Sequence, residues 1–242
     1  MTDNGLRCLV TGAASGIGAA VAERLRARGD RVVGADREEL PDGLRVDLSD
    51  PAGRHDLVAR ASDVLGGLDV LVNVAGVFAE TPVLSSTLEQ WRAVWAVDLE
   101  APLELMREAA VTMAATGFGR IVNITSVHAG FAQPDCLAYD VAKAGLEAAT
   151  RSFALDTARH GVLVNAVAPG FVRTRMSLTA EGVDETDTEA FRERYVRHGL
   201  LPLGRAALPE EIAHVVGWLA SRENTYVTGQ VLVADGGLTT TF

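Results

Sequence analysis

Tyr139 and Lys143 are a pair of residues whose types and spacing could do chemistry. They lie four residues apart in the segment AYDVAKAGLEAA, which is about one helical turn, so the phenol and the ammonium would share a face. A nearby positive charge favours phenolate and lowers the pKa of a tyrosine. Such a phenol can exchange a proton with an alcohol oxygen. The spacing is also typical of ordinary amphipathic helices, so the pair alone leaves both interpretations open.

A glycine-rich turn near the N-terminus is a second candidate site. The segment TGAASGIG at 11–18 joins an apolar run to a segment of helical period. Glycines let a backbone approach a ligand closely, and the N–H groups at the start of a helix can bind a pyrophosphate. The spacing is GxxxGxG rather than the common GxGxxG fingerprint. We expect phosphate binding here, and a purely structural turn is the alternative.

Asp36 ends the next apolar run, eighteen residues after Gly18. A carboxylate at this place can bind the ribose hydroxyls of an adenosine and would repel a 2′-phosphate. Arg37 follows it and could bind that phosphate, which weakens the preference for a cofactor without a 2′-phosphate. The two residues therefore favour NAD, with NADP as the less favoured cofactor; a carboxylate that only caps the strand is the alternative.

The elements that must position these residues follow from the hydrophobic pattern. Continuous apolar runs are typical of parallel strands covered on both faces, and here they alternate with segments of helical period. Such alternation predicts right-handed βαβ units, a parallel sheet and an α/β fold. We expect one dinucleotide-binding and catalytic domain over residues 1–242. The apolar runs span residues 6–12, 31–36, 68–76, 120–126, 162–170 and 230–237.

Residues 175–205 depart from this pattern. They are polar, with four acidic residues between Asp184 and Glu189, and then aromatic at Phe191 and Tyr195. A solvated pair of surface helices would explain this composition. A lid over a pocket would explain it equally well, because long insertions after the carboxyl end of a strand lie where ligands bind.

The composition argues against several functional classes. The chain has 242 residues, is 48% hydrophobic and has a net charge of −10, which disfavours nucleic-acid and polybasic membrane partners. No apolar run reaches the length of a membrane span, and the N-terminus does not resemble a signal peptide. Cys8 and Cys136 lack metal-ligand spacing and are expected to be free thiols. We expect a soluble, cytoplasmic protein without a metal.

Together, these motifs resemble those of the short-chain dehydrogenase/reductase family, in the form of the family whose chains are about as long as this one. The similarity runs from about Leu6 to Gly237, and the segment at 11–18 resembles the family's TGxxxGxG cofactor loop. Ser126, thirteen residues before Tyr139, completes the family's Ser, Tyr and Lys pattern. The resemblance implies a Rossmann-type doubly wound parallel sheet of seven strands, in the order 3-2-1-4-5-6-7, with helices on both faces and the site at the switch point.

The resemblance also extends the set of expected cofactor residues. Asp47 matches the acid that contacts adenine, and the segment 73–76 resembles the NNAG motif that steadies the sheet. One amide of that motif is missing, at Val72 or at Val74 according to how the motif is aligned. Pro169-Gly170 with Thr174 resembles the PG motif, whose threonine holds the nicotinamide amide. The expected cofactor-binding set is Gly12, Ser15, Gly16, Ile17, Gly18, Asp36, Arg37, Asp47, Leu48, Asn73, Ala75, Gly76, Tyr139, Lys143, Pro169, Gly170, Val172 and Thr174.

By the same resemblance, Tyr139 is the acid/base, Lys143 lowers its pKa and binds the nicotinamide ribose, and Ser126 holds the substrate oxygen. Many members carry an asparagine as a fourth catalytic residue, where this chain has Asp98. An ionised carboxylate only accepts hydrogen bonds, but it could still hold the family's water and would stabilise the Lys143 ammonium. The replacement of asparagine by Asp98 could be harmless, or it could alter the pH optimum of the reaction; the sequence leaves both interpretations open.

His128 lies two residues after Ser126 and could bond a substrate hydroxyl or carboxylate. A locally bonded loop histidine is the alternative. The expected substrate site is therefore Ser126, His128 and Tyr139. Trp91 and Trp95 are four residues apart and are expected in the core or at a subunit contact. Weaker pocket candidates are Phe131, Gln133, Met176 and Tyr195.

The predicted function is hydride transfer between NAD and a secondary alcohol or ketone of a small, polar, cyclic molecule. The stretch after the second strand resembles dehydrogenases of cyclic dihydrodiols, and the SVHAG run resembles sugar and polyol dehydrogenases. The alternatives are a 3-oxoacyl or polyketide ketoreductase that uses NAD(P)H, and an NAD-binding regulator without turnover. The family resemblance implies a homotetramer.

Overall fold

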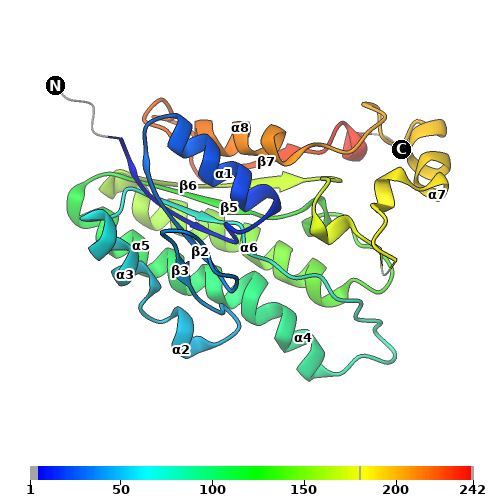
Figure 1. Cartoon of the computed structure of the whole chain (residues 1–242), viewed down its shortest axis with the longest axis horizontal. Coiled ribbons are helices and arrows are strands. Elements are labelled where there is room, and N and C mark those ends of the chain that lie inside the picture. Colours follow the sequence, from blue (N-terminus) through cyan, green and yellow to red (C-terminus); the bar gives the residue numbers. More distant parts are fainter. Residues whose placement is uncertain (1–4, 180, 241–242) are drawn as a thin grey trace.

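Seven parallel strands form one sheet at the centre of the protein (Figure 1). The structure is a computed structural model that describes residues 5–179 and 181–240. The order is β3-β2-β1-β4-β5-β6-β7, so the fold class and strand order expected from the resemblance are confirmed. The strands are β1 (Arg7–Thr11), β2 (Arg31–Asp36), β3 (Leu44–Arg45), β4 (Val70–Asn73), β5 (Gly119–Ile124), β6 (Val162–Pro169) and β7 (Val231–Ala234).

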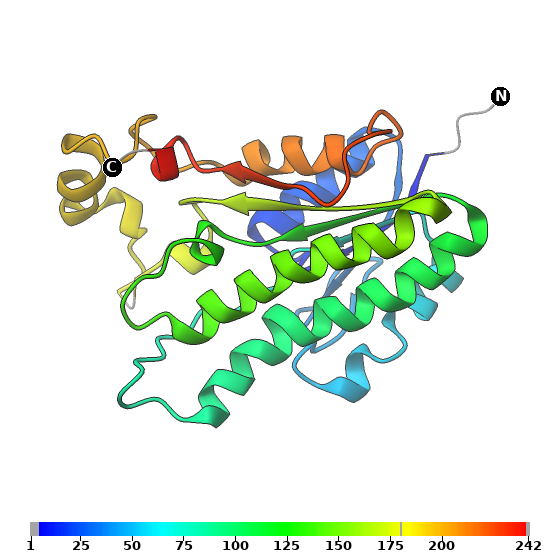
Figure 2. The same cartoon turned by 180° about the vertical axis from the view of Figure 1, so that it is seen from behind.

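Helices cover both faces of the sheet (Figures 1 and 2). On one face α1 (Gly16–Ala27) packs against α8 (Pro209–Leu219), and on the other α5 (Ala101–Thr116) lies between α3 (Leu57–Leu65) and α6 (Leu137–Thr157). No helix among the described residues is long and apolar enough to cross a membrane. The remaining helices are α2 (Pro51–Arg54), α4 (Leu88–Trp95) and α7 (Glu189–Phe191).

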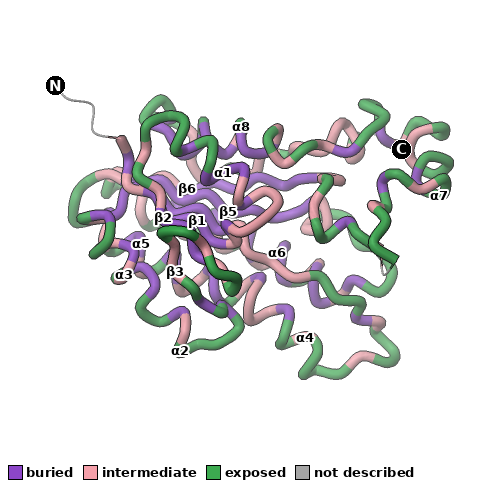
Figure 3. Tube along the Cα trace, viewed as in Figure 1, coloured by how far each residue is buried: buried purple, intermediate pink, exposed green. Residues whose placement is uncertain are grey.

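Each face of the sheet has its own hydrophobic core, and the central strands are buried between them, whereas the edge strands β3 and β7 are partly exposed (Figure 3). Leu9 and Leu71 belong to the core under α3, α5 and α6, whereas Val10 and Val72 belong to the core under α1 and α8. This alternation follows from the period of two along a strand. Because both faces are covered, the strands read as continuous apolar runs, as the sequence predicted.

Two details differ from the sequence prediction. β3 has only two residues, Leu44 and Arg45, which is too short to form an apolar run. The right-handed rule also fails at one crossover: α1 and α8 share a face, although the steps from β1 to β2 and from β6 to β7 run in opposite directions along the sheet. The two crossovers therefore have opposite hands. The long connection between Pro169 and Pro209 removes the direct strand-to-helix packing on which the rule depends.

The carboxyl ends of β1, β4, β5 and β6 point to the same edge of the parallel sheet. The glycine turn follows β1, Asn73 ends β4, Ser126 follows β5 and Pro169 ends β6. The topology therefore gathers residues that are far apart in the sequence at the edge where α/β proteins bind ligands.

Candidate active site

Glycines shape the turn between β1 and α1. Gly12 has a φ of +67°, and a Cβ added to it would lie 2.9 Å from the Cα of Ala75. A Cβ on Gly18 would lie 2.0 Å from the carbonyl oxygen of Gly12. Among the residues that the structure describes, Ser15 at the N-cap of α1 makes no side-chain capping hydrogen bond, so the first N–H groups of the helix are left for another acceptor. These features fit the pyrophosphate of a dinucleotide.

Asp36 lies at the end of β2, beside the glycine turn. Its Oδ2 accepts a hydrogen bond from the N–H of Ala14 at 3.0 Å, and its Oδ1 accepts one from the N–H of Glu38 at 3.0 Å. Arg37 is exposed. The carboxylate expected to bind ribose therefore contacts the loop expected to bind phosphate, and its ribose role stays a prediction.

Asp47 and Leu48 follow β3 at the same side of the sheet. Asp47 Oδ1 accepts hydrogen bonds from the hydroxyl of Ser49 at 2.7 Å and from its N–H at 2.9 Å, and these bonds lower the pKa of Asp47. Leu48 is buried. Among the described residues, these local bonds leave the second carboxylate oxygen of Asp47 for a ligand.

Asn73 links two central strands. Its Nδ2 donates to Oδ1 of Asn123 on β5 at 2.9 Å, and both side chains are buried. The N–H of Ala75, two residues on, donates to Oγ1 of Thr11 at 3.2 Å. These bonds fix the turn after β4 to β1 and β5, which is the sheet-steadying place that the resemblance gave this segment.

Tyr139 and Lys143 share a face of α6 near its N-terminal end. Tyr139 is 9% exposed and Lys143 3% exposed, and Nζ of Lys143 lies 5.3 Å from the centroid of the tyrosine ring. Nζ donates to the carbonyl oxygen of Ile124, the last residue of β5, at 3.3 Å. Ser126 caps the short 3₁₀ turn Val127–Ala129 that follows β5. The three residues of the expected catalytic pattern therefore meet between β5 and α6.

Burial dominates the titration of Tyr139. Burial raises its pKa, Lys143 lowers it, Asp98 raises it, and a hydrogen bond with Ser126 lowers it; the result lies above the ordinary value. The spacing predicted the effect of the lysine but gave no sign of the larger effect of burial. The pKa of Lys143 is lowered by burial, but the negative charge of Asp98 outweighs this, so it too is raised.

Asp98 lies in a π-helical turn, Ala96–Glu100, that joins α4 to α5. It is fully buried, and its Oδ1 accepts a hydrogen bond from the N–H of Val77 at 2.7 Å. Its Oδ2 lies 3.5 Å from Nζ of Lys143 and has no hydrogen-bond partner in the part of the chain described. Burial raises the pKa of Asp98, although Lys143 acts against it. Single π turns are frequent at functional sites, and this one brings Asp98 to the lysine.

His128 forms a pair with Asp140 that the sequence did not reveal. Nδ1 of His128 lies 2.7 Å from Oδ1 of Asp140, and the histidine ring meets the Tyr139 ring edge-on, with centroids 5.6 Å apart. The N–H of His128 donates to Oγ of Ser126 at 3.2 Å. With Sγ of Cys136, the two paired atoms form a group within 4.8 Å of one another, which the spacing of the cysteines did not predict.

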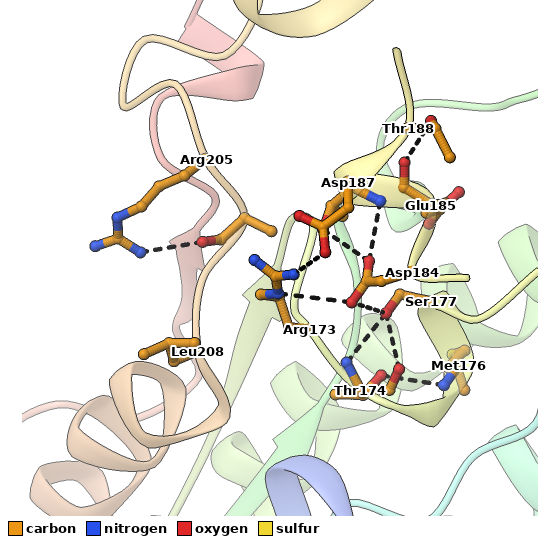
Figure 4. Close-up of polar contacts among 12 residues, drawn as sticks. Arg173, Thr174, Met176, Ser177, Asp184, Glu185, Asp187, Thr188, Arg205 and Leu208 are labelled. Atoms are coloured by element: carbon orange, nitrogen blue, oxygen red, sulfur yellow. Dashed lines mark hydrogen bonds and ion pairs between the residues drawn. The ribbon is translucent and has the colours of Figure 1, made fainter. Parts of the chain in front are cut away.

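The segment that follows β6 is held by Arg173 (Figure 4). Its guanidinium forms ion pairs with Asp184, at 3.6 Å, and with Asp187. Asp184 also accepts hydrogen bonds from Thr186 and from Oγ of Ser177. Two carboxylates, Asp184 and Asp187, thus converge on one arginine beside the end of the strand, and Ser177 and Thr186 bond to the first of them.

Thr174 lies against the glycine turn. Its Oγ1 accepts a hydrogen bond from the N–H of Met176 at 3.2 Å (Figure 4), and a Cβ on Gly16 would lie 3.2 Å from its methyl carbon. Arg175 pairs with Glu38, which lies two residues after β2, at 2.7 Å. The end of β6 therefore meets the loops after β1 and β2, as the PG and glycine motifs require.

The aromatic candidates divide into packed and exposed side chains. Trp95 donates from Nε1 to the carbonyl oxygen of Ala138 at 3.0 Å, and both tryptophans pack in the cluster around Tyr139. Trp91 and Trp95 therefore pack against the core, as one of the two expectations has it, and a subunit contact stays a prediction. Tyr195 packs on Phe171 and Phe191. The exposed candidates are Phe131, Gln133 and Met176.

Comparisons with known proteins agree with this geometry. Residues 12–239 match the family described as enoyl-(acyl carrier protein) reductase. The chain is 37% identical to the cis-4-hydroxycyclohexanecarboxylate dehydrogenase of Sinomonas cyclohexanicum, over 96% of this chain and 95% of the relative. It is 34% identical to the 3-oxoacyl-[acyl-carrier-protein] reductase FabG of Vibrio cholerae, over 98% and 99%.

A solved structure extends the similarity to the fold. It is a proposed NAD(P)-dependent gluconate 5-dehydrogenase from Beutenbergia cavernae with NADP bound at low occupancy; the TM-score is 0.87 and the identity 33%, over 99% of this chain and 98% of that one. Such identities hold along nearly the whole length of each pair of chains. The protein therefore belongs to the short-chain dehydrogenase/reductase family of oxidoreductases, which use a nicotinamide cofactor.

Proposed function

We propose that this protein is an NAD-dependent dehydrogenase that interconverts a secondary alcohol and a ketone on a small, polar, cyclic molecule. The observation that carries the proposal is the buried Tyr139–Lys143 pair. It lies beside Ser126, at the same carboxyl edge of the sheet as the glycine turn. A buried phenol next to an ammonium and a hydroxyl is suited to proton transfer at an alcohol oxygen.

In the proposed reaction, the bound cofactor supplies or accepts the hydride at the substrate carbon. The Tyr139 hydroxyl exchanges the accompanying proton with the substrate oxygen. Ser126 donates a hydrogen bond to the same oxygen and stabilises the charge that develops there. Lys143, whose raised pKa keeps it charged, stabilises the phenolate form of Tyr139. The low exposure of this group excludes water from the proton transfer.

The preference for NAD rests on Asp36. Its carboxylate lies at the glycine turn, 3.0 Å from the N–H of Ala14, where a negative charge opposes a 2′-phosphate. The NADP in the Beutenbergia structure and the exposed Arg37 favour the other cofactor. A comparison of kcat/KM for NAD and NADP with the same substrate tests the preference.

The proposed substrate class is a cyclic alcohol of the dihydrodiol, sugar or polyol type. Support for a ring comes from the name of one relative, the dehydrogenase of a hydroxylated ring acid, and support for a polyol comes from the proposed dehydrogenase of gluconate, an open-chain polyol acid. The second candidate is a ketoreductase, which is favoured by the 34% identity to FabG. A regulator without turnover would have no need of Ser126, Tyr139 and Lys143, which are all present.

The test is the change in NADH absorbance with a panel of cyclic alcohols, polyols and ketones. Oxidation of cyclic alcohols supports the dehydrogenase. Reduction of 3-oxoacyl thioesters alone would favour the ketoreductase, and binding of NAD without turnover on the whole panel would favour the regulator. NAD binding is followed separately, by calorimetry.

We further propose that residues 1–242 act as one domain and that residues 175–205 form a lid. The ion pairs of Arg173 with Asp184 and of Arg175 with Glu38 support the lid, because they hold this segment over the edge of the sheet. Substrate analogues should slow proteolysis within this segment.

We also propose a cytoplasmic homotetramer. Ala142 and Leu146 on α6 are not free for a subunit contact, because they are buried in the core of the same chain. Val111 on α5 and Leu155 on α6 are 68% and 82% exposed, and apolar surface of this kind is suited to a partner. Light scattering of the purified protein tests the oligomeric state.

A further inference from the structure

We propose that His128 accepts a hydrogen bond from a second hydroxyl group of the substrate, and that Asp140 is the positioning residue that makes it an acceptor. The inference rests on the proposed function and deepens it. It names the substrates as diols or polyols whose second hydroxyl lies beside the reacting one.

The position of His128 next to the reacting groups is the first observation. Its N–H donates to Oγ of Ser126 at 3.2 Å, and its ring meets the ring of Tyr139 edge-on at 5.6 Å. Ser126 and Tyr139 are the two residues proposed to hold the reacting oxygen. A substituent on the neighbouring carbon of the substrate would therefore lie within reach of the imidazole.

The partner of the imidazole decides which of its two nitrogens carries the hydrogen and which can accept a hydrogen bond. Oδ1 of Asp140 lies 2.7 Å from Nδ1, and an ionised carboxylate can only accept, so Nδ1 carries the hydrogen. In a neutral imidazole the other nitrogen, Nε2, is then an acceptor. Within the described residues no hydrogen bond occupies Nε2. The side chains are 17% and 15% exposed, so the pair is partly shielded from water, which strengthens the bond.

The surrounding charges favour a hydroxyl over an anionic substituent. Cys136, whose Sγ lies within 4.8 Å of the two paired atoms, has a raised pKa, because of burial and the negative charges of Asp140, Asp135 and Glu80. The same charges oppose a carboxylate beside His128. A neutral group that donates a hydrogen bond is therefore the partner that suits this part of the site.

The test compares cis-1,2-cyclohexanediol with its mono-methyl ether, 2-methoxycyclohexanol, as substrates with NAD. The ether keeps the ring and the reacting hydroxyl but cannot donate to His128. We expect kcat/KM for the diol to exceed that for the ether about tenfold in the wild-type protein, as one hydrogen bond allows. Assays contain EDTA, because a metal bound by Cys136 and Asp140 would compete for His128.

Variants test whether His128 and Asp140 cause the difference in kcat/KM between the diol and the ether. His128→Phe keeps a ring beside Tyr139 but removes both nitrogens, and it should bring the ratio close to one. Asp140→Asn no longer obliges Nδ1 to carry the hydrogen and should lower the ratio, whereas Asp140→Glu should retain more of it. Asp156→Asn, an exposed change of the same charge on the same helix, should leave the ratio unchanged.

A wild-type ratio near one, with both alcohols oxidised, overturns this inference and leaves the proposed dehydrogenase intact. A ratio that persists in His128→Phe also overturns it. If neither alcohol is oxidised, affinities of the two for the protein–NADH complex, measured by NADH fluorescence, decide in the same way. Equal affinities contradict the inference, and tighter binding of the diol that disappears in His128→Phe supports it.

Discussion

Oδ2 of Asp98 lies 3.5 Å from Nζ of Lys143, and the two side chains form a buried ion pair. The family pattern that the sequence resembles has an asparagine at this place, which carries no charge. The carboxylate acts on Tyr139 in the opposite sense to the lysine, because its negative charge raises the pKa of the phenol. Asp98 therefore partly offsets the lowering of the phenol's pKa by the Lys143 ammonium.

Asp98→Asn should move the pH profile of alcohol oxidation to lower pH. Oxidation needs the phenolate, so activity rises as pH passes through the pKa of Tyr139. Removing a negative charge lowers that pKa, so we expect the rising limb of kcat/KM to shift to lower pH. The amide oxygen can still accept from the N–H of Val77, so the turn should persist. Superimposable profiles would show that Asp98 is a harmless replacement.

Tyr139→Phe should lower kcat by about a hundredfold to ten-thousandfold, the usual contribution of an acid/base group. The ring contacts with Phe78 and His128 do not need the hydroxyl, so the fold and NAD binding should persist. Steady-state rates, circular dichroism and NAD calorimetry measure the three properties. Turnover within a few-fold of wild type would refute the assignment of Tyr139.

The parts of the fold and site that the sequence predicts are those set by local chemistry. The spacing of Tyr139 and Lys143 on one helical face and the apolar runs of the strands depend only on neighbours in the chain. The pairing of His128 with Asp140 depends on how a loop meets a helix. No period in the sequence encodes that contact. The only signal was a carboxylate in the first turn of α6, beside the tyrosine.

Burial is the other quantity that the sequence could not supply. The spacing gave the sign of the effect of Lys143 on Tyr139, but the larger effect comes from packing around the phenol, which is 9% exposed. The charge of Asp98 was visible in the sequence. Its distance from Lys143 depends on the π-helical turn Ala96–Glu100, whose residues are also suited to an ordinary helix.

Asp36→Asn should lower the preference for NAD over NADP. The amide oxygen can still accept from the N–H of Ala14, so the glycine turn should keep its shape, while the bond from the N–H of Glu38 and the charge that repels a 2′-phosphate are lost. We expect the ratio of kcat/KM for NAD to that for NADP to fall at least about tenfold. Asp42→Asn, an exposed change in the loop after β2, is the control. An unchanged ratio would mean that Asp36 only caps the strand.

Arg173→Gln should loosen residues 175–205. It removes the ion pairs with Asp184 and Asp187, so chymotrypsin should cut near Phe191 and Tyr195 faster and KM should rise a few-fold. Arg192→Gln, at an exposed position of the same segment, is the matched control. Equal cleavage rates in the two variants would show that Arg173 does not hold the segment.

The pH dependence of this effect follows from Asp184. Burial alone would raise its pKa, but hydrogen bonds from Thr186 and Ser177 and the charge of Arg173 outweigh burial, so the pKa is lowered. A lowered carboxyl pKa contributes stability that is complete above the unfolded value of about 4 and is lost as pH falls through the folded value. Wild-type protection from cleavage should therefore be constant from pH 8 to pH 5, when measured relative to a peptide substrate of the protease.

Thr150→Val should destabilise the fold without touching the active site. Oγ1 of Thr150 accepts from Nδ2 of Asn123 at 2.9 Å and donates to the carbonyl oxygen of Leu146 at 2.8 Å, and it is fully buried. Valine has the same shape but leaves the amide hydrogen of Asn123 without this acceptor, which costs about 1–3 kcal/mol. For a domain of this size each kcal/mol lowers Tm by about 2–4 °C. Thr112→Val, which removes only a bond from a partly buried hydroxyl to its own helix, should change Tm much less. Equal changes in the two variants would mean that the hydrogen bonds that link Asn73, Asn123 and Thr150 add no stability of their own.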